Sequence, residues 1–170
     1  MNNLNGMRCY LSGAIEFGAG DWRAELTPFL KSLGVTVFDP TNKKVLGFDE
    51  SLEDVNRRKT LKSTANYDQV SREMRRIRCI DLRMVDLSDF VIVNLDMDTY
   101  TTGTWEEVTL ANRQKKPLIF RIQQGKGRAP DWLFGMIDHE MIFDTWFEVK
   151  QQLLFGSLDS RWVVFNLDGS

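Results

Sequence analysis

The stretch Phe90-Val91-Ile92-Val93-Asn94-Leu95 decides the fold, because it is a near-continuous apolar run of strand length. Such runs are typical of strands that are buried on both faces in a parallel sheet. A helical pattern precedes the run at 67–86, and another follows it at 103–114. Strands and helices that alternate in this way predict an α/β fold.

The alternation continues toward both ends of the chain. Further strands are predicted at 7–12, 35–38, 117–122 and 141–143, and further helices at 21–33, 131–137 and 145–155. We interpret the polar stretch 41–66 as a long loop with a short helix near 52–59, and 161–167 as a strand-like arm. The elements predict one domain over 1–170, built as a doubly wound five-stranded parallel sheet with helices on both faces. Ligands of such sheets bind beyond the carboxyl ends of the strands.

Composition and charge exclude several classes of protein. The 170 residues carry 22 basic and 24 acidic side chains, a net charge of −2 that argues against binding nucleic acid through bulk charge. The apolar runs are too short to cross a bilayer, and the first residues lack the apolar core of a signal peptide. Because Cys9 and Cys79 form no CxxC pair, we expect free thiols and a cytoplasmic protein. The single His139 excludes a two-histidine metal site and no glycine-rich phosphate loop is present, so we expect no metal and no cofactor.

One carboxylate lies on the apolar stripe of the 67–86 helix. Steps of four and three residues place on one face Val70, Met74, Ile77, Asp81 and Met84. A carboxylate in that position is costly to desolvate unless it is paired or hydrogen-bonded. Two interpretations of Asp81 stay open: a structural residue that caps a loop or pairs with an arginine, and a proton donor whose pKa is raised by burial.

Two further polar clusters follow predicted strands. Tyr10-Leu11-Ser12-Gly13-Ala14-Ile15 ends the first strand, and 96–107 connects the deciding strand to the next helix. Taken alone, Tyr10 suits a core position, and the hydroxyls and glutamates of 102–107 suit the start of a helix. Glu106 and Glu107 point about 100° apart, so only one of them can face the edge of the sheet.

Together the clusters resemble the nucleoside 2-deoxyribosyltransferase family, which includes related nucleoside 5′-monophosphate N-glycosidases. The matching pieces stand in the family's order: Tyr10-Leu11-Ser12-Gly13, Asp81 with Ser88-Asp89, Gly103-Thr104-Trp105-Glu106-Glu107 and Lys116-Pro117. The resemblance covers most of 10–142. It implies a flavodoxin-like fold, a nucleoside or nucleotide substrate, and a homo-oligomer, dimeric or larger, whose subunits share active sites.

The resemblance also implies a mechanism. Glu107 matches the family's nucleophile, Asp81 the residue that assists protonation of the base, and Tyr10 the residue that positions the nucleophile. Glu107 would attack C1′ and form a covalent glutamyl-ribosyl intermediate, and a second nucleobase or water would then take the sugar. Transferase and hydrolase both remain open.

Around these three residues the predicted substrate-binding residues are Ser12, Gly13, Ile15, Phe17, Thr101, Gly103, Trp105 and Asp131. For Phe17 and Trp105, stacking on the base and packing in the core are equally good interpretations. Thr101 stands where the deoxyribosyltransferases usually have an aspartate for the sugar's 5′-hydroxyl and the glycosidases have a serine for phosphate. Asp131 stands where a neighbouring subunit contributes asparagine, or serine in the glycosidases. The choice between a nucleoside and a 5′-monophosphate therefore stays open, with the nucleoside slightly favoured because Asp131 would repel a phosphate.

A rival of another class is a non-catalytic module that binds nucleotides or nucleic acid. Residues 43–83 contain 11 basic and 7 acidic side chains. A basic face can follow phosphates, although a solvated helix surface is the commoner explanation.

Overall fold

Five parallel strands form the sheet of this computed structural model, which describes residues 4–15, 22–43 and 52–158. The strands are β1 (Arg8–Gly13), β2 (Thr36–Phe38), β3 (Phe90–Leu95), β4 (Leu118–Ile122) and β5 (Ile142–Phe143). Their order in the sheet is β2-β1-β3-β4-β5, which is the flavodoxin-like order. Successive strands are added on one side of β1 and then on the other, so the topological switch point lies between β1 and β3. The predicted doubly wound, five-stranded fold is confirmed.

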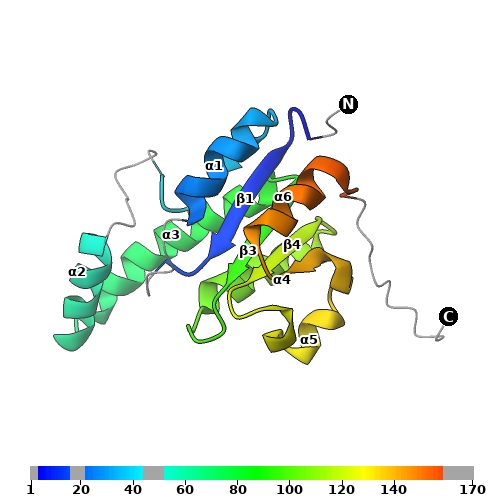
Figure 1. Cartoon of the computed structure of the whole chain (residues 1–170). Coiled ribbons are helices and arrows are strands. Elements are labelled where there is room, and N and C mark those ends of the chain that lie inside the picture. Colours follow the sequence, from blue (N-terminus) through cyan, green and yellow to red (C-terminus); the bar gives the residue numbers. More distant parts are fainter. Residues whose placement is uncertain (1–3, 16–21, 44–51, 159–170) are drawn as a thin grey trace.

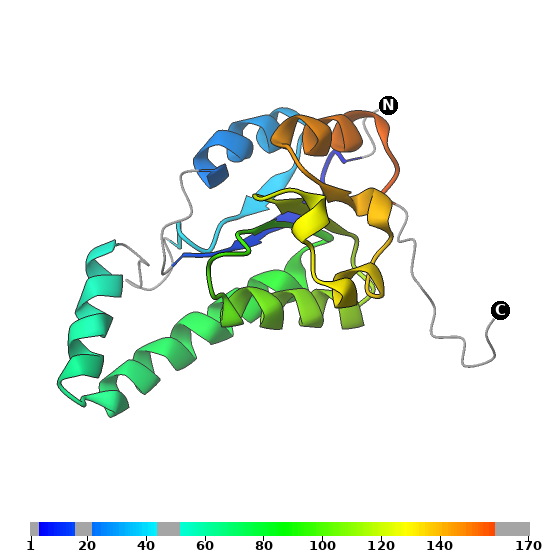
Figure 2. The same ribbon diagram turned by 60° about the horizontal axis from the view of Figure 1, so that its bottom comes forward.

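Helices cover both faces of this sheet (Figures 1 and 2). One face carries α1 (Trp22–Ser32) and α6 (Trp146–Phe155), and the other carries α3 (Tyr67–Leu87) and α4 (Thr102–Arg113). Every residue of β3 is buried, with Val91 and Val93 packed on the α3/α4 side and Ile92 on the α1/α6 side. Burial on both faces explains why β3 is apolar nearly throughout.

The helix α2 (Leu52–Ser63) and the first half of α3 form a hairpin that projects beyond the carboxyl edge of the sheet (Figures 1 and 2). Across the hairpin, Arg57 pairs with Glu73, with an Nη1–Oε1 distance of 2.7 Å. The predicted short helix near 52–59 is confirmed, but it extends to Ser63, and α3 follows shortly after it in place of the expected loop. The buried side of α2 includes Val55 and Arg58, so one of its inward positions is charged and the apolar period is weak.

Shorter elements complete the description. The helix α5 (Asp131–Phe134) ends before Gly135 and is shorter than the predicted helix at 131–137. Single 3₁₀ turns span Lys126–Arg128 and His139–Met141. The predicted arm at 161–167 lies outside the described residues. None of the helices described is long and apolar enough to cross a membrane.

Two tryptophans join the helices on the α1/α6 side. Trp22 begins α1 and Trp146 begins α6, and their rings stack with centroids 5.1 Å apart. The Arg23 guanidinium lies 4.5 Å from the centroid of the Trp22 ring, and the Arg121 guanidinium 5.5 Å from that of Trp146. The stack fixes the starts of both helices beside the carboxyl edge of the sheet.

Candidate active site

The site is built around Glu107, which lies on the second turn of α4 and is only 9% exposed. Tyr10 Oη donates to Glu107 Oε1 at 2.8 Å, and Ser12 Oγ donates to Oε2 at 2.5 Å. Tyr10 and Ser12 reach the same carboxylate because residues two apart on β1 point to the same face of the sheet. Burial and the negative charge of Glu107 raise the pKa of Tyr10 well above its ordinary value. The phenol therefore stays protonated and keeps its role as a donor.

The neighbouring Glu106 also lines the first cavity described below, but it has a different partner. It forms an ion pair with Arg78 on α3, with Nε 2.8 Å from Glu106 Oε2. The hydrogen bond from Arg78 holds the pKa of Glu106 below its usual value. The two glutamates thus have different surroundings: Glu107 is held by strand β1, and Glu106 by a partly exposed arginine.

Asp81 lies on the buried face of α3, as its place in the stripe predicts, and is 7% exposed. Its partner is Lys43, whose Nζ lies 2.6 Å from Asp81 Oδ1 and whose side chain is 1% exposed. The sequence pattern indicated an arginine or a loop cap as the partner of Asp81, and a lysine takes that place. The negative charge of Asp81 also contributes to the raised pKa of Tyr10, so the two residues are electrostatically coupled.

A cavity of about 490 Å³ opens over these residues, a size in the usual range for small-molecule sites. Glu107 and Asp81 both line it, and the outer wall is formed by the hairpin of α2 and α3. Apolar contacts on that wall come from Val55, Met74 and Ile77. The cavity is therefore acidic at its inner end and mixed apolar and basic farther out.

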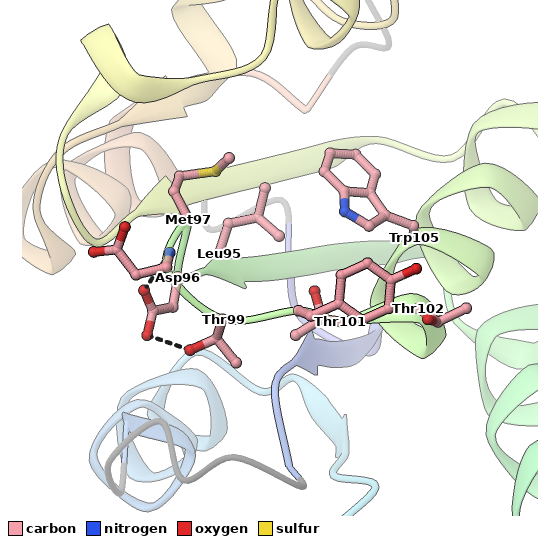
Figure 3. Close-up of a pocket in the computed structure, with 9 residues that line it drawn as sticks. Leu95, Asp96, Met97, Thr99, Thr101, Thr102 and Trp105 are labelled. Atoms are coloured by element: carbon pink, nitrogen blue, oxygen red, sulfur yellow. Dashed lines mark hydrogen bonds between the residues drawn. The ribbon is translucent and has the colours of Figure 1, made fainter.

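A second cavity of about 470 Å³ follows the loop between β3 and α4 (Figure 3). Tyr100, Thr101 and Thr102 line both cavities, so the two adjoin at the start of α4. Asp96 forms part of its wall and accepts hydrogen bonds from Gln124 Nε2 and from Thr99 Oγ1 at 2.7 Å. These bonds, that from Gln124 first, hold the pKa of Asp96 below its usual value.

Most of the predicted site residues come together at this edge. Of the predicted residues, those that line the first cavity are Gly13, Ile15, Asp81, Thr101, Gly103 and Glu107. Trp105 lines the second cavity, and Tyr10 and Ser12 donate hydrogen bonds to Glu107. Asp131 begins α5, is exposed and lines neither cavity. Phe17 lies outside the described residues.

Gly13 allows the end of β1 to lie close to the backbone of β3. A Cβ built at this position would lie 2.8 Å from the carbonyl oxygen of Asn94 on β3. Arg23 then secures the same turn, because its Nη2 donates to the carbonyl of Gly13 at 2.8 Å and its Nε to that of Leu11 at 3.3 Å. The end of β1 is therefore fixed by packing on one side and by a buried guanidinium on the other.

Sequence reasoning missed three buried cations of this region, namely Arg23, Lys43 and Arg58. A signal existed for Lys43, which comes shortly after Asp39-Pro40 at the carboxyl end of β2, on the edge where ligands bind. Nothing in the local sequence distinguishes Arg58 from the basic residues around it.

Comparisons with known proteins place the fold. No family model and no curated protein matches the sequence. The structure is similar to that of a 2-deoxyribosyltransferase from Bacillus psychrosaccharolyticus, with a TM-score of 0.60, 19% identity, and coverage of 92% of this chain and 99% of that chain. A 2-deoxyribosyltransferase from Leishmania mexicana matches with a TM-score of 0.46 and 17% identity over 71% of this chain and 67% of that chain. The first likeness shows that the two proteins share a fold.

Proposed function

We propose that this chain cleaves the N-glycosidic bond of a nucleoside or deoxynucleoside, as nucleoside 2-deoxyribosyltransferases do. One observation carries the proposal: a buried carboxylate, held by two hydroxyl groups, faces a cavity that a second carboxylate also lines. The order of the sequence motifs and the fold shared with a 2-deoxyribosyltransferase support it.

In the proposed mechanism, Glu107 attacks C1′ of the sugar and forms an ester while the C1′–N bond breaks. The electron pair of that bond goes to the departing base, which takes up a proton. The Asp81–Lys43 pair supplies this proton, since Lys43 Nζ and Asp81 Oδ1 lie 2.6 Å apart beside the cavity. A second base or water then attacks C1′, gives up a proton to the Asp81–Lys43 pair and releases the Glu107 carboxylate.

The hydroxyl groups around Glu107 suit this chemistry. A carboxylate has about four lone-pair positions, and Tyr10 and Ser12 occupy one on each oxygen. The two donors fix the carboxylate in one orientation. Such preorganisation lowers the cost of aligning the nucleophile with C1′.

We propose that the sugar's 5′ end points toward Thr101 and the second cavity, because the base lies on the side of Asp81. Asp96 and Asp98 line that second cavity. Their negative charges favour a 5′-hydroxyl over a phosphate that carries about −1.5 to −2 charges. A nucleoside is therefore the favoured substrate, and a 5′-monophosphate is the alternative.

We further propose a cytoplasmic homo-oligomer in which Asp131 contributes to the site of a neighbouring subunit. Asp131 lines neither of the two cavities formed by the described residues at this edge. The adjacent Trp132 and Phe134 are 82% and 41% exposed, which suits an apolar contact between subunits.

The test is chromatography of deoxynucleosides and their 5′-monophosphates after incubation, with and without a free base. Base release only with an added base identifies a transferase, and release without one identifies a hydrolase. Glu107→Ala should abolish release, and Glu106→Ala is the matched control that should stay active. Loss of activity in Glu106→Ala but not in Glu107→Ala would refute the assignment, and no release from any compound would refute the proposed function.

A further inference from the structure

Arg58 is a buried cation that the proposed mechanism does not use. It lies on α2, is 8% exposed, and lines the cavity that contains Glu107 and Asp81. Within the described ranges, its guanidinium makes no hydrogen bond and no ion pair. Its charge helps to lower the pKa of Glu73, but the hydrogen bonds of that carboxylate come from Arg57 and Gln69.

The hairpin geometry indicates where Arg58 lies relative to the chemistry. The Arg57–Glu73 ion pair shows that these two residues lie side by side across the α2/α3 hairpin. On α3, Glu73 is eight residues before Asp81, about 12 Å along the helix axis. Arg58, which lines the cavity, therefore lies farther along the hairpin from the sheet than Asp81. If Asp81 protonates the base, as the proposed function holds, Arg58 faces the edge of the base that is farthest from the sugar.

The chemistry of a guanidinium limits what that edge can be. Arginine has five N–H donors and no acceptor, so a buried arginine requires acceptors from its partner. Guanine and thymine present a carbonyl oxygen at this edge, and adenine and cytosine present an amino group, which is a donor. An amino group set against Arg58 brings two donors together and loses the hydrogen bond that an oxo group accepts there, which is costly in a buried site.

We infer that Arg58 is a specificity-determining residue that selects bases with an oxo group over their amino counterparts. The preferred substrates are then nucleosides of guanine, hypoxanthine, uracil or thymine, and those of adenine and cytosine are disfavoured. Val55, Met74 and Ile77 line the same cavity and supply apolar contacts for the faces of the ring. This inference rests on the proposed function for the direction in which the base points.

The experiment uses two substrate pairs that differ mainly in this one group: deoxyinosine against deoxyadenosine, and deoxyuridine against deoxycytidine. Affinities are measured by titration calorimetry on a Glu107→Gln background, so that the readout does not depend on turnover. We expect the oxo member of each pair to bind about 10 to 100 times more tightly, the usual size of a well-placed arginine contact to a base.

Two substitutions then test the residue itself. Arg58→Gln should bring the oxo-to-amino affinity ratio of each pair close to one, because an amide offers both a donor and an acceptor. Arg58→Met should have the same effect, because its side chain offers no strong donor or acceptor. If circular dichroism shows that one variant does not fold, the other variant provides the test. Lys59→Gln is the matched control, since Lys59 is the next residue on α2, is exposed and does not line the cavity; its ratios should stay unchanged.

Several outcomes would overturn the inference: equal affinities within both pairs, a preference that survives both Arg58 substitutions, or no binding of any of the four nucleosides. A loss confined to the binding of 5′-monophosphates would also overturn it, because Arg58 would then hold the phosphate. The proposed function fails separately, when the unmodified chain binds these nucleosides but releases no base.

Discussion

Tyr10→Phe removes one hydroxyl group from the centre of the site and keeps the ring that packs in the core. The ring is fully buried against Val85 and Val108, so its packing is retained. The loss is the 2.8 Å hydrogen bond to Glu107 Oε1. Hydrogen bonds to charged groups are worth about 1.5–3 kcal/mol. For a chain of this length, that corresponds to a fall in Tm of about 3–12 °C.

A double-mutant cycle with Glu107→Gln shows whether the carboxylate is the partner. In the glutamine background the hydrogen bond is between neutral groups and is worth about 0.5–1.5 kcal/mol, so Tyr10→Phe should cost less there. The expected coupling is about 1 kcal/mol, measured by urea unfolding at neutral pH. Equal costs of Tyr10→Phe in the two backgrounds would refute the reasoning.

The raised pKa of Tyr10 adds a test at alkaline pH. Below about pH 10 the phenol is protonated in both the folded and the unfolded state, so Tyr10 adds no pH dependence there. Above that pH the unfolded chain loses the proton while the folded chain keeps it, because the folded pKa is higher. The free energy of unfolding should then fall by up to about 1.4 kcal/mol per pH unit from this residue, and Tyr10→Phe should lack that component. Parallel curves for the two proteins above pH 10 would contradict the raised pKa.

Three further predictions concern the same edge of the sheet and the surface beyond it. Asp81→Asn should lower turnover by about 10²–10⁴ in initial-rate assays, because the amide cannot pass on a proton; near-normal turnover would leave Asp81 as a structural partner of Lys43. Gly13→Ala should destabilise the fold by about 1–3 kcal/mol in thermal melts, since the new methyl group collides with the Asn94 carbonyl; an unchanged Tm would show that β1 shifts freely. Sedimentation at micromolar concentration should give at least a dimer, which Trp132→Ser weakens, and a fully active monomer would contradict the shared site.

The sequence predicted the sheet well because its strands are the most apolar segments and are separated by clear helical patterns. The run 90–95 coincides with β3, and the stripe that ends at Asp81 lies on the buried face of α3. At α2 the prediction gave a helix that was too short, because Arg58 occupies an inward position and the apolar period is weak. A cavity wall need not obey the pattern of a core, because a ligand can take the place of the missing contact.

The site was predictable only where its residues form motifs in order along the chain. Tyr10, Ser12 and Glu107 belong to such motifs, and the structure brings their side chains within hydrogen-bond distance. Lys43 reaches Asp81 from a different element, 38 positions away in the sequence, and a pairing of that range leaves no local pattern. Contacts of this kind depend on the order of strands in the sheet. That order cannot be predicted from the periodicity of apolar residues along the sequence.

The stacked pair Trp22 and Trp146 gives the molecule an internal optical reporter. Two indoles 5.1 Å apart with ring planes 12° from parallel couple their electronic transitions, which produces a circular dichroism signal that separate rings lack. Arg23, next to Trp22, donates to the backbone at the end of β1, where Gly13 lines the cavity. A ligand that shifts the end of β1 should therefore alter this signal, and occupancy of the cavity can be followed without any attached label.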